Sequence, residues 1–176
     1  YYTKYAAHVL GYVGAMNSEE WEYYKDIDGY LMDARVGKSG FEAAFEEYLH
    51  GIDGWKEVTV DAQGNILSEV FPQVPVAGNN VETTLDLNLQ VAAENALEDV
   101  MLARRNQEEG MPGRDAEGAA VVAIDVKTGQ VLVCASYPTY DLSRYFEDYK
   151  QIIETDYDPL YNRALMGAYP PGSTYK

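Results

Sequence analysis

A serine and a lysine stand three positions apart in the segment Gly172-Ser173-Thr174-Tyr175-Lys176. If Gly172 and Ser173 open a helix, the hydroxyl and the amine project from one face within hydrogen-bond reach. A serine hydroxyl is a poor nucleophile until a base removes its proton, and a lysine desolvated in a cleft has a pKa low enough to do so. The helix N-terminus would add backbone N–H donors for a developing oxyanion. The spacing therefore predicts acyl transfer through a covalent serine intermediate.

The residues before this pair suit such a site. Pro170 and Pro171 restrict the approach to the turn, and Gly172 lets a substrate come close to the backbone. By itself the S-x-x-K spacing is weakly specific, because chance places it in a chain with six serines about one time in three. In that case Ser173 would be a plain helix cap, so the wider context has to decide.

Three other candidate signals favour structure over chemistry. Lys127-Thr128-Gly129 stands between two apolar runs, where a glycine at a turn explains the triplet. Gly37-Lys38-Ser39 lacks the earlier glycine of a phosphate loop, since that position holds Met32. His8 and His50 have no acidic or cysteine neighbours at ligand spacing, so no metal site is predicted, and no cofactor.

Composition excludes some partners. The 176 residues include 13 Lys and Arg against 29 Asp and Glu, a formal charge of −16, which repels nucleic acid and anionic lipid. The hydrophobic fraction of 47% is enough for a buried core. Cys134 is the only cysteine, so an intrachain disulfide is excluded. No run approaches the ~18 apolar residues of a membrane span, and the abrupt start and end predict a piece of a longer protein.

The first part of the chain mixes helices and short strands. Ser18 followed by acidic residues predicts a helix N-cap, and apolar residues at helical spacing predict one helix over residues 40–49. The apolar face of that helix would hold Phe41, Ala44, Phe45, Tyr48 and Leu49. Residues 58–60 and 66–67 flank a turn with Gly64, which predicts a hairpin. The prolines and glycine of residues 72–78 then predict a linker.

The second part repeats the mixture. Residues 80–85 predict a strand, and Asp86 predicts the cap of a helix from Leu87 to about Arg105. The buried stripe of that helix would comprise Leu89, Ala93, Ala96, Leu97, Val100 and Met101. After a loop over residues 106–117, the apolar runs 119–124 and 130–135 predict two central strands covered on both faces. The chain is thus expected to have an α+β fold.

Five segments in order resemble one protein family, the class B penicillin-binding proteins of high molecular weight. The resemblance near Ser173 lies in Asn162-Arg163-Ala164-Leu165 and in Tyr169-Pro170-Pro171-Gly172-Ser173-Thr174-Tyr175-Lys176. The earlier matching segments are Gly11-Tyr12-Val13-Gly14, Gly37 to Glu42 with Tyr48-Leu49-His50-Gly51, Thr84-Leu85-Asp86 with Leu89-Gln90 and Ala93-Glu94, and Gly118 to Val122 with Ala135 to Pro138. A chance match would not keep these segments in order.

The resemblance implies a peptidoglycan D,D-transpeptidase that cross-links cell-wall stem peptides and is acylated by beta-lactams. Ser173 would be the nucleophile, Lys176 the base, and Gly172 and Thr174 would contact substrate. It implies a partial pedestal, or dimerisation-like, domain over residues 1–77 and the start of a transpeptidase domain over 78–176. The family's S-x-N and K-[ST]-G motifs would follow residue 176, so this piece alone is expected to be inactive.

The family's location and partners are implied in the same way. The parent protein would be anchored in the cytoplasmic membrane and work on its outer face. A binding role stays open beside the enzyme, in which residues 1–77 dock a membrane glycosyltransferase of the shape, elongation, division and sporulation family. A beta-lactam sensor or hydrolase is a third reading, disfavoured because such proteins generally lack the pedestal motif of residues 37–42.

Overall fold

The computed structural model describes residues 3–170. They form two compact units, which we call the continuous unit, residues 12–82, and the discontinuous unit, residues 3–11 with 83–170. Both contain helices and antiparallel strand pairs, which confirms the predicted α+β class. The predicted domain boundary after residue 77 stays a prediction; the contacts group residues 3–11 with the second half of the chain.

The continuous unit contains two separate two-stranded sheets and three short helices. The elements before its hairpin are β1 (Val13–Ala15), α2 (Ser18–Tyr24), β2 (Arg35–Gly37), α3 (Gly40–Ala44) and α4 (Glu46–Leu49). The predicted helix at residue 18 is present, but its cap is Asn17 and not Ser18. Asn17 Oδ1 accepts from Glu20 N–H while Glu20 Oε2 accepts from Asn17 N–H, the reciprocal capping box.

The single helix predicted over residues 40–49 is wrong in detail. Phe45 has φ −117° and ψ 20°, which ends α3 and starts α4. The break lets Glu46 turn inward, where it is 5% exposed, while Tyr48 of the predicted apolar face is 63% exposed. Glu46 Oε2 accepts from Gly37 N–H at 2.6 Å, and Oε1 lies 2.8 Å from His50 Nδ1. A buried carboxylate with such partners outweighs the helical periodicity of the apolar residues.

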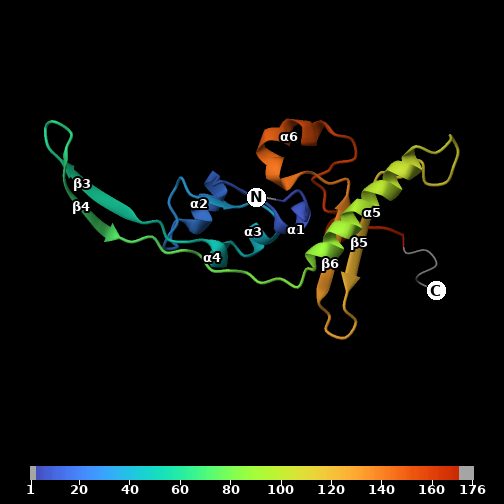
Figure 1. The fold of residues 1–176 in the computed structure, drawn as a ribbon, viewed down its shortest axis with the longest axis horizontal. Helices are drawn as coiled ribbons and strands as arrows, with labels where there is room; N and C mark the ends of the chain where they lie inside the picture. The colour runs from blue at the N-terminus through green and yellow to red at the C-terminus, as the bar shows by residue number, and fades with distance from the viewer. Residues whose placement is uncertain (1–2, 171–176) are drawn as a thin grey trace. The chain divides into compact units, whose positions relative to one another are not determined.

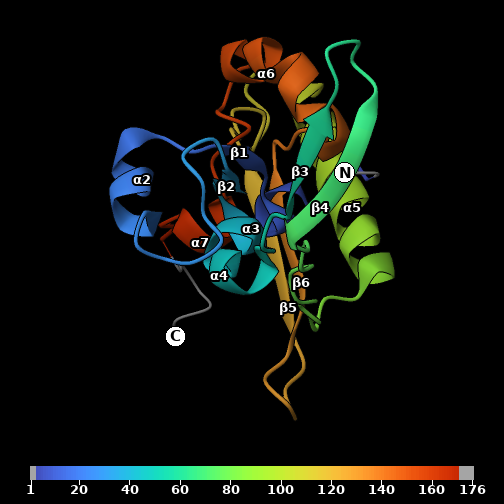
Figure 2. The same ribbon diagram turned by 90° about the vertical axis from the view of Figure 1, so that its left-hand side faces the viewer.

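The predicted hairpin of the continuous unit is confirmed. Strands β3 (Trp55–Val60) and β4 (Ile66–Gln73) pair antiparallel and lie side by side in Figures 1 and 2. Asp61 fixes the turn between them by accepting from the N–H groups of Gln63 and Asn65. All side chains of both strands are exposed, including Val58 and Phe71.

The long helix of the discontinuous unit is α5 (Leu87–Arg105), and its predicted cap is confirmed. Asp86 Oδ1 accepts from the N–H groups of Asn88 and Leu89. The strand predicted over residues 80–85 is wrong. That segment is extended, but it meets β6 only through single bonds, Thr84 Oγ1 to the Val131 carbonyl and Asp86 N–H to the Leu132 carbonyl.

The buried face of α5 also differs from the prediction. The fully buried residues are Gln90, Glu94, Leu97 and Met101, whereas Leu89 and Val100 are exposed. Gln90 is 1% exposed because its amide bonds both backbone groups of Cys134, accepting from N–H at 2.9 Å and donating to the carbonyl at 3.0 Å. A hydrogen-bonded amide can therefore occupy the core where periodicity placed leucine and valine.

The second hairpin joins β5 (Ala119–Ile124) to β6 (Val131–Tyr137). Lys127-Thr128-Gly129 forms its turn, as predicted, with Gly129 at φ 75°. Residues 133–137 of β6 are buried, but Val122 and Ile124 of β5 are exposed, so the coverage predicted for both faces is wrong for β5. Within residues 3–170 the sheet has only these two strands.

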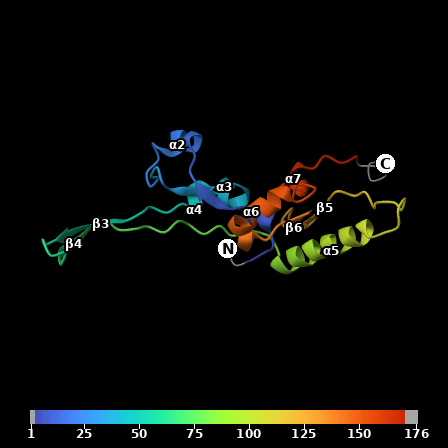
Figure 3. The same cartoon turned by 90° about the horizontal axis from the view of Figure 1, so that it is seen from above.

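Alternation along β6 separates two packing faces. Val133, Ala135 and Tyr137 pack with Leu97 and Met101 of α5 in the core of this unit. Ser136 points to the opposite face, where α7 (Arg163–Met166) lies; Figure 3 shows α5 and α7 on either side of the hairpin. The remaining elements are α1 (Ala7–Leu10), the 3-10 turn η1 (Leu142–Arg144) and α6 (Tyr145–Glu154).

Candidate active site

The four predicted site residues, Gly172, Ser173, Thr174 and Lys176, lie outside the described residues. Their mutual geometry therefore stays a prediction. What the structure does describe is the chain that leads to them, namely residues 157–170 with α7, and the elements against which that chain packs. The functional question becomes how α7, four residues long, is held in place.

Helix α7 is fixed at its first turn by Asn162 and Ser136. Asn162 Oδ1 caps the helix by accepting from Leu165 N–H at 3.2 Å. The same oxygen lies 3.3 Å from Ser136 Oγ, which in turn accepts from Ala164 N–H at 3.0 Å. One hydroxyl of the β5–β6 hairpin thus joins the cap residue and a backbone donor of α7, so the hairpin sets where this helix begins.

Arg163 holds the loop that precedes α7. Its guanidinium donates to the carbonyls of Asp158 at 3.0 Å and Tyr161 at 3.3 Å, and also to that of Tyr157. Tyr157 and Asp158 have φ of 66° and 46°, a left-handed conformation that side chains disfavour. The three bonds stabilise this bend, because one rigid fork of donors reaches several carbonyls at once.

Gly118 gives the Arg163 side chain its space. A Cβ on Gly118 would lie 2.2 Å from Arg163 Nε and 2.7 Å from the Tyr137 carbonyl oxygen. The glycine at the start of the hairpin is therefore required by a close approach. It is part of the packing that positions α7.

The N-terminal segment contacts the same loop. His8 Nε2 lies 2.7 Å from the carbonyl oxygen of Pro159, and the His8 ring meets the edge of Tyr140 at 5.3 Å between centroids. Burial lowers the pKa of His8, as does the nearby Arg163, while the Pro159 carbonyl and Asp158 act in the opposite direction. Histidine is therefore held here mainly as a neutral donor to a buried carbonyl.

A buried polar pair ties the same segment to α5. Glu94 is 7% exposed, and its Oε1 accepts from Ala6 N–H at 2.8 Å and from Gln90 Nε2 at 2.7 Å. Burial raises the pKa of Glu94, while these two hydrogen bonds and Lys4 lower it. Glu94 thus anchors residue 6, whose backbone is left-handed at φ 57°.

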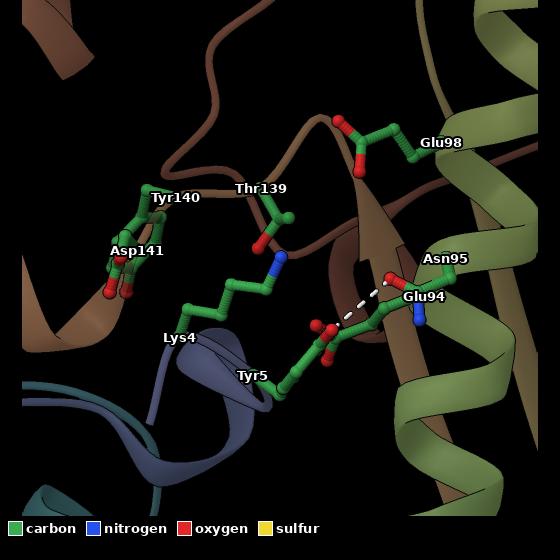
Figure 4. A pocket seen from close by; sticks show the side chains of 8 residues that line it. All are labelled: Lys4, Tyr5, Glu94, Asn95, Glu98, Thr139, Tyr140 and Asp141. Atoms are coloured by element: carbon green, nitrogen blue, oxygen red, sulfur yellow. Dashed lines mark hydrogen bonds between the residues drawn. The ribbon is translucent and has the colours of Figure 1, made fainter. Parts of the chain in front are cut away.

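An open pocket lies beside Glu94, between α5 and the N-terminal segment (Figure 4). It is lined by Lys4, Tyr5, Glu94, Asn95, Glu98, Thr139, Tyr140 and Asp141. The pocket contains no activated nucleophile of the kind predicted at Ser173, so it does not compete as the catalytic centre. Within residues 3–170 no cluster of three or more His, Cys, Asp or Glu side chains could hold a metal ion.

Comparison with known families identifies the two halves of the chain. Residues 1–83 match the Penicillin-binding Protein dimerisation domain, and residues 119–176 match the Penicillin binding protein transpeptidase domain. The chain belongs to the class B penicillin-binding proteins. The family expected from the five sequence segments is thereby confirmed.

Individual relatives agree. The chain is 37% identical to the Peptidoglycan D,D-transpeptidase MrdA of Acinetobacter baumannii over 97% of this chain and 23% of that protein. A structure of a peptidoglycan synthase complex that coordinates polymerization and crosslinking aligns with a TM-score of 0.74 and 36% identity, over 90% of this chain and 28% of the other. Penicillin-binding protein 2 of Pseudomonas aeruginosa, in complex with WCK 5153, aligns with a TM-score of 0.68 and 32% identity, over 98% and 31%. This penicillin-binding protein chain thus spans about a quarter of the relative's length.

Sequence reasoning missed the roles of three residues that contact α7 or the loop before it. It identified Asn162 and Arg163 only as part of a family motif, and it considered His8 only as a metal ligand. An asparagine directly before an apolar turn is a readable cap signal, so the role of Asn162 could have been found. Nothing in the sequence indicates that His8 meets Pro159, 151 positions away.

The helices within residues 3–170 include none with the length and apolar character that a membrane crossing requires.

Proposed function

We propose that the parent protein is a serine D,D-transpeptidase of peptidoglycan synthesis, with Ser173 as nucleophile and Lys176 as base. The observation that carries the proposal is the transpeptidase-domain match over residues 119–176, which includes the S-x-x-K pair. The packing of α7 on the β5–β6 hairpin supports it, because the element leading to Ser173 is backed by a sheet.

The reaction has two steps. Lys176 accepts the Ser173 proton as Oγ attacks the penultimate D-Ala carbonyl of a stem peptide; the amide C–N bond breaks and the proton passes to the departing D-Ala amine. An amine of a neighbouring stem then attacks the acyl-serine ester, which forms the cross-link and frees the serine. Gly172 lets the peptide approach, and Thr174 contributes to its binding. A beta-lactam would acylate the same oxygen and stay attached.

The 176-residue chain is proposed to be inactive by itself. The S-x-N and K-[ST]-G motifs that complete such a site are expected after Lys176, and the first hairpin supplies only two strands of the sheet. We place the parent protein at the cytoplasmic membrane, acting on its outer face, as its family resemblance implies.

The test is mass spectrometry of the full-length protein after reaction with a labelled penicillin. The proposal expects one adduct on the peptide that carries Ser173, and none in Ser173→Ala. An adduct on another residue, or no adduct in a folded protein, would contradict it.

A second role is favoured by one feature of the continuous unit. The β3–β4 hairpin exposes apolar side chains, including Val58 at 40% and Phe71 at 58%, beyond what a solvated hairpin needs. The similar structure of a peptidoglycan synthase complex that coordinates polymerization and crosslinking supports a synthase partner, and we propose that a membrane glycosyltransferase binds this hairpin. Val58→Asp with Phe71→Ser should abolish its capture by the full-length protein, with Asp61→Asn in the turn as the control. Retained capture would remove the hairpin from the interface.

A beta-lactam sensor or hydrolase is a weaker alternative. The match of residues 1–83 to the dimerisation domain speaks against it, because such sensors and hydrolases generally lack this region. Rapid release of hydrolysed penicillin by the full-length protein would favour the hydrolase.

A further inference from the structure

The segment at residues 3–11 packs with the discontinuous unit although the 71 residues from 12 to 82 separate it from the rest of that unit. It is held at three points. Ala6 N–H donates to the buried Glu94, the Ala7 carbonyl accepts from Tyr140 Oη at 3.4 Å, and His8 reaches Pro159. The first two contacts fix the segment to α5 and to the chain after β6. The third is made to the loop that leads into α7.

The His8 contact satisfies a partly buried backbone acceptor. Pro159 is a buried residue, and its carbonyl oxygen lies 2.7 Å from His8 Nε2. A carbonyl partly shielded from water is destabilised when it loses its donor, so without His8 the loop would shift to reach water or another donor. The edge contact of the His8 ring with Tyr140 fixes the direction from which the donor approaches.

Asn162, which follows Pro159 in the loop, also contacts His8. Asn162 Nδ2 lies 3.5 Å from the His8 carbonyl oxygen, a long hydrogen bond, while Asn162 Oδ1 caps α7. His8 therefore meets the loop through its side chain at residue 159 and through its backbone at residue 162. Together these contacts restrain both ends of the segment that sets the start of α7.

Helix α7 depends on such contacts. It has four residues, a single turn, which is far too short to be stable without external restraints. Its last residue, Met166, precedes Ser173 by seven positions in the sequence.

Taking Ser173 as the nucleophile, as proposed above, we propose that His8 is a positioning residue for its acylation. The imidazole N–H holds the Pro159 carbonyl and the His8 backbone holds Asn162, so that the start of α7, which precedes Ser173 in the chain, keeps one position. This role rests on the proposed transpeptidase function and adds a residue remote in sequence to its site.

The test uses the full-length protein and two variants that separate the donor from the ring. His8→Gln keeps an N–H donor at the distance of Nε2, and His8→Phe keeps the ring against Tyr140 but removes the donor. The rate of Ser173 acylation by a fluorescent penicillin is followed over a range of penicillin concentrations, which separates binding from the acylation step. Rates are normalised to the folded fraction, and Ser173→Ala gives the background.

We expect His8→Phe to slow the acylation step about tenfold with penicillin binding changed less than about twofold, because misplacing a reacting group by 1 Å costs on the order of 100-fold. His8→Gln should restore the rate to within about threefold of wild type. Leu97→Ala, which opens a cavity in the α5 core, should lower the melting temperature without this loss. If His8 served only stability, His8→Phe would behave like Leu97→Ala: the melting temperature would fall and the acylation rate would not.

Asn162→Ser provides an independent variant, because serine keeps a helix cap but loses the amide that reaches the His8 carbonyl. It should also slow the acylation step, and it decides the matter if His8→Phe does not fold. Normal acylation in either folded variant would overturn the role of His8 while leaving the proposed function intact. Absence of Ser173 acylation in the wild type would instead refute the proposed function.

Discussion

At the residue scale, matched hydrogen bonds hold the elements of the discontinuous unit in place, and those made by Glu94 and Gln90 are buried. Ser136, Asn162 and Arg163 hold α7 by contacts whose donors and acceptors match. Glu94 and Gln90 do the same for the N-terminal segment and β6. Because an unpaired buried group costs more than a pair gains, single substitutions here are expected to have large effects.

His8 makes the stability of the discontinuous unit depend on pH. Its folded pKa lies below the ordinary 6.5 because burial disfavours the cation, with Arg163 adding to this and Pro159 and Asp158 opposing it. The unfolded state therefore binds a proton first, so the stability contribution is complete above about pH 6.5 and falls as the pH drops through the folded pKa. Glu94 has the opposite sign, since burial raises its pKa, and its contribution is lost as pH rises from 4.5 through the folded value.

Thermal unfolding of the wild type and His8→Gln between about pH 7.5 and 5.5 checks this sign. The wild type should lose more melting temperature on acidification than the variant, which cannot be protonated at residue 8. Equal losses in the two proteins would remove His8 from the pH dependence.

Gly118→Ala tests the close approach of Arg163. The new Cβ would lie 2.7 Å from the rigid Tyr137 carbonyl oxygen as well as against the Arg163 side chain. We expect a loss of about 1–3 kcal/mol in the free energy of unfolding, measured by urea denaturation. Gly14→Ala is the control, because its Cβ would meet only the flexible Lys38 side chain at 3.1 Å. A neutral Gly118→Ala would mean that Arg163 can move aside.

At the scale of elements, the sequence predicts the kind and limits of the long elements well. Helix α5 and both hairpins lie where periodicity, caps and turn glycines placed them, since these signals are local. The prediction fails where a partner distant in the sequence decides whether a segment pairs or a side chain is buried. Residues 80–85 have strand-like composition but find no full ladder, and Gln90 is buried because a strand 44 positions away offers it both backbone groups.

Substitutions on the buried and the exposed face of α5 test whether a distant partner decides which residues are buried. Gln90→Leu would leave the Cys134 N–H and carbonyl unpaired, so we expect a loss of roughly 2–4 kcal/mol in unfolding free energy by urea denaturation. Leu89→Ala on the exposed face should change it by less than about 0.5 kcal/mol. Periodicity alone predicts the reverse order, and that result would contradict the observed packing of α5.

The start of α2 can be tested in the same way. Asn17→Ala removes the side-chain acceptor of the capping box, Oδ1, while the backbone N–H of residue 17 can still donate to Glu20, and it should lower the free energy of unfolding by about 0.5–2 kcal/mol. Ser18→Ala, at the position that the sequence suggested as the cap, should have an effect of only a few tenths of a kcal/mol. Chemical denaturation monitored in the continuous unit distinguishes the two, and a larger effect at Ser18 would restore the sequence-based assignment.

At the scale of the whole molecule, the family was readable from sequence because it depends on motifs that occur in a fixed order. The family matches over residues 1–83 and 119–176 confirm the membership. The grouping of residues 3–11 with 83–170 was not readable, because no local pattern shows that a chain returns to its beginning. That return brings His8 to Pro159, the contact on which the proposed positioning role of His8 rests.

The most direct test of the account is the site and rate of acylation in the full-length protein. A labelled penicillin should form one adduct, on the peptide that carries Ser173, and Lys176→Ala should slow its formation by about 100-fold or more with the protein still folded. An adduct elsewhere, or an unchanged rate in Lys176→Ala, would contradict the central claim that this serine and lysine form the catalytic pair.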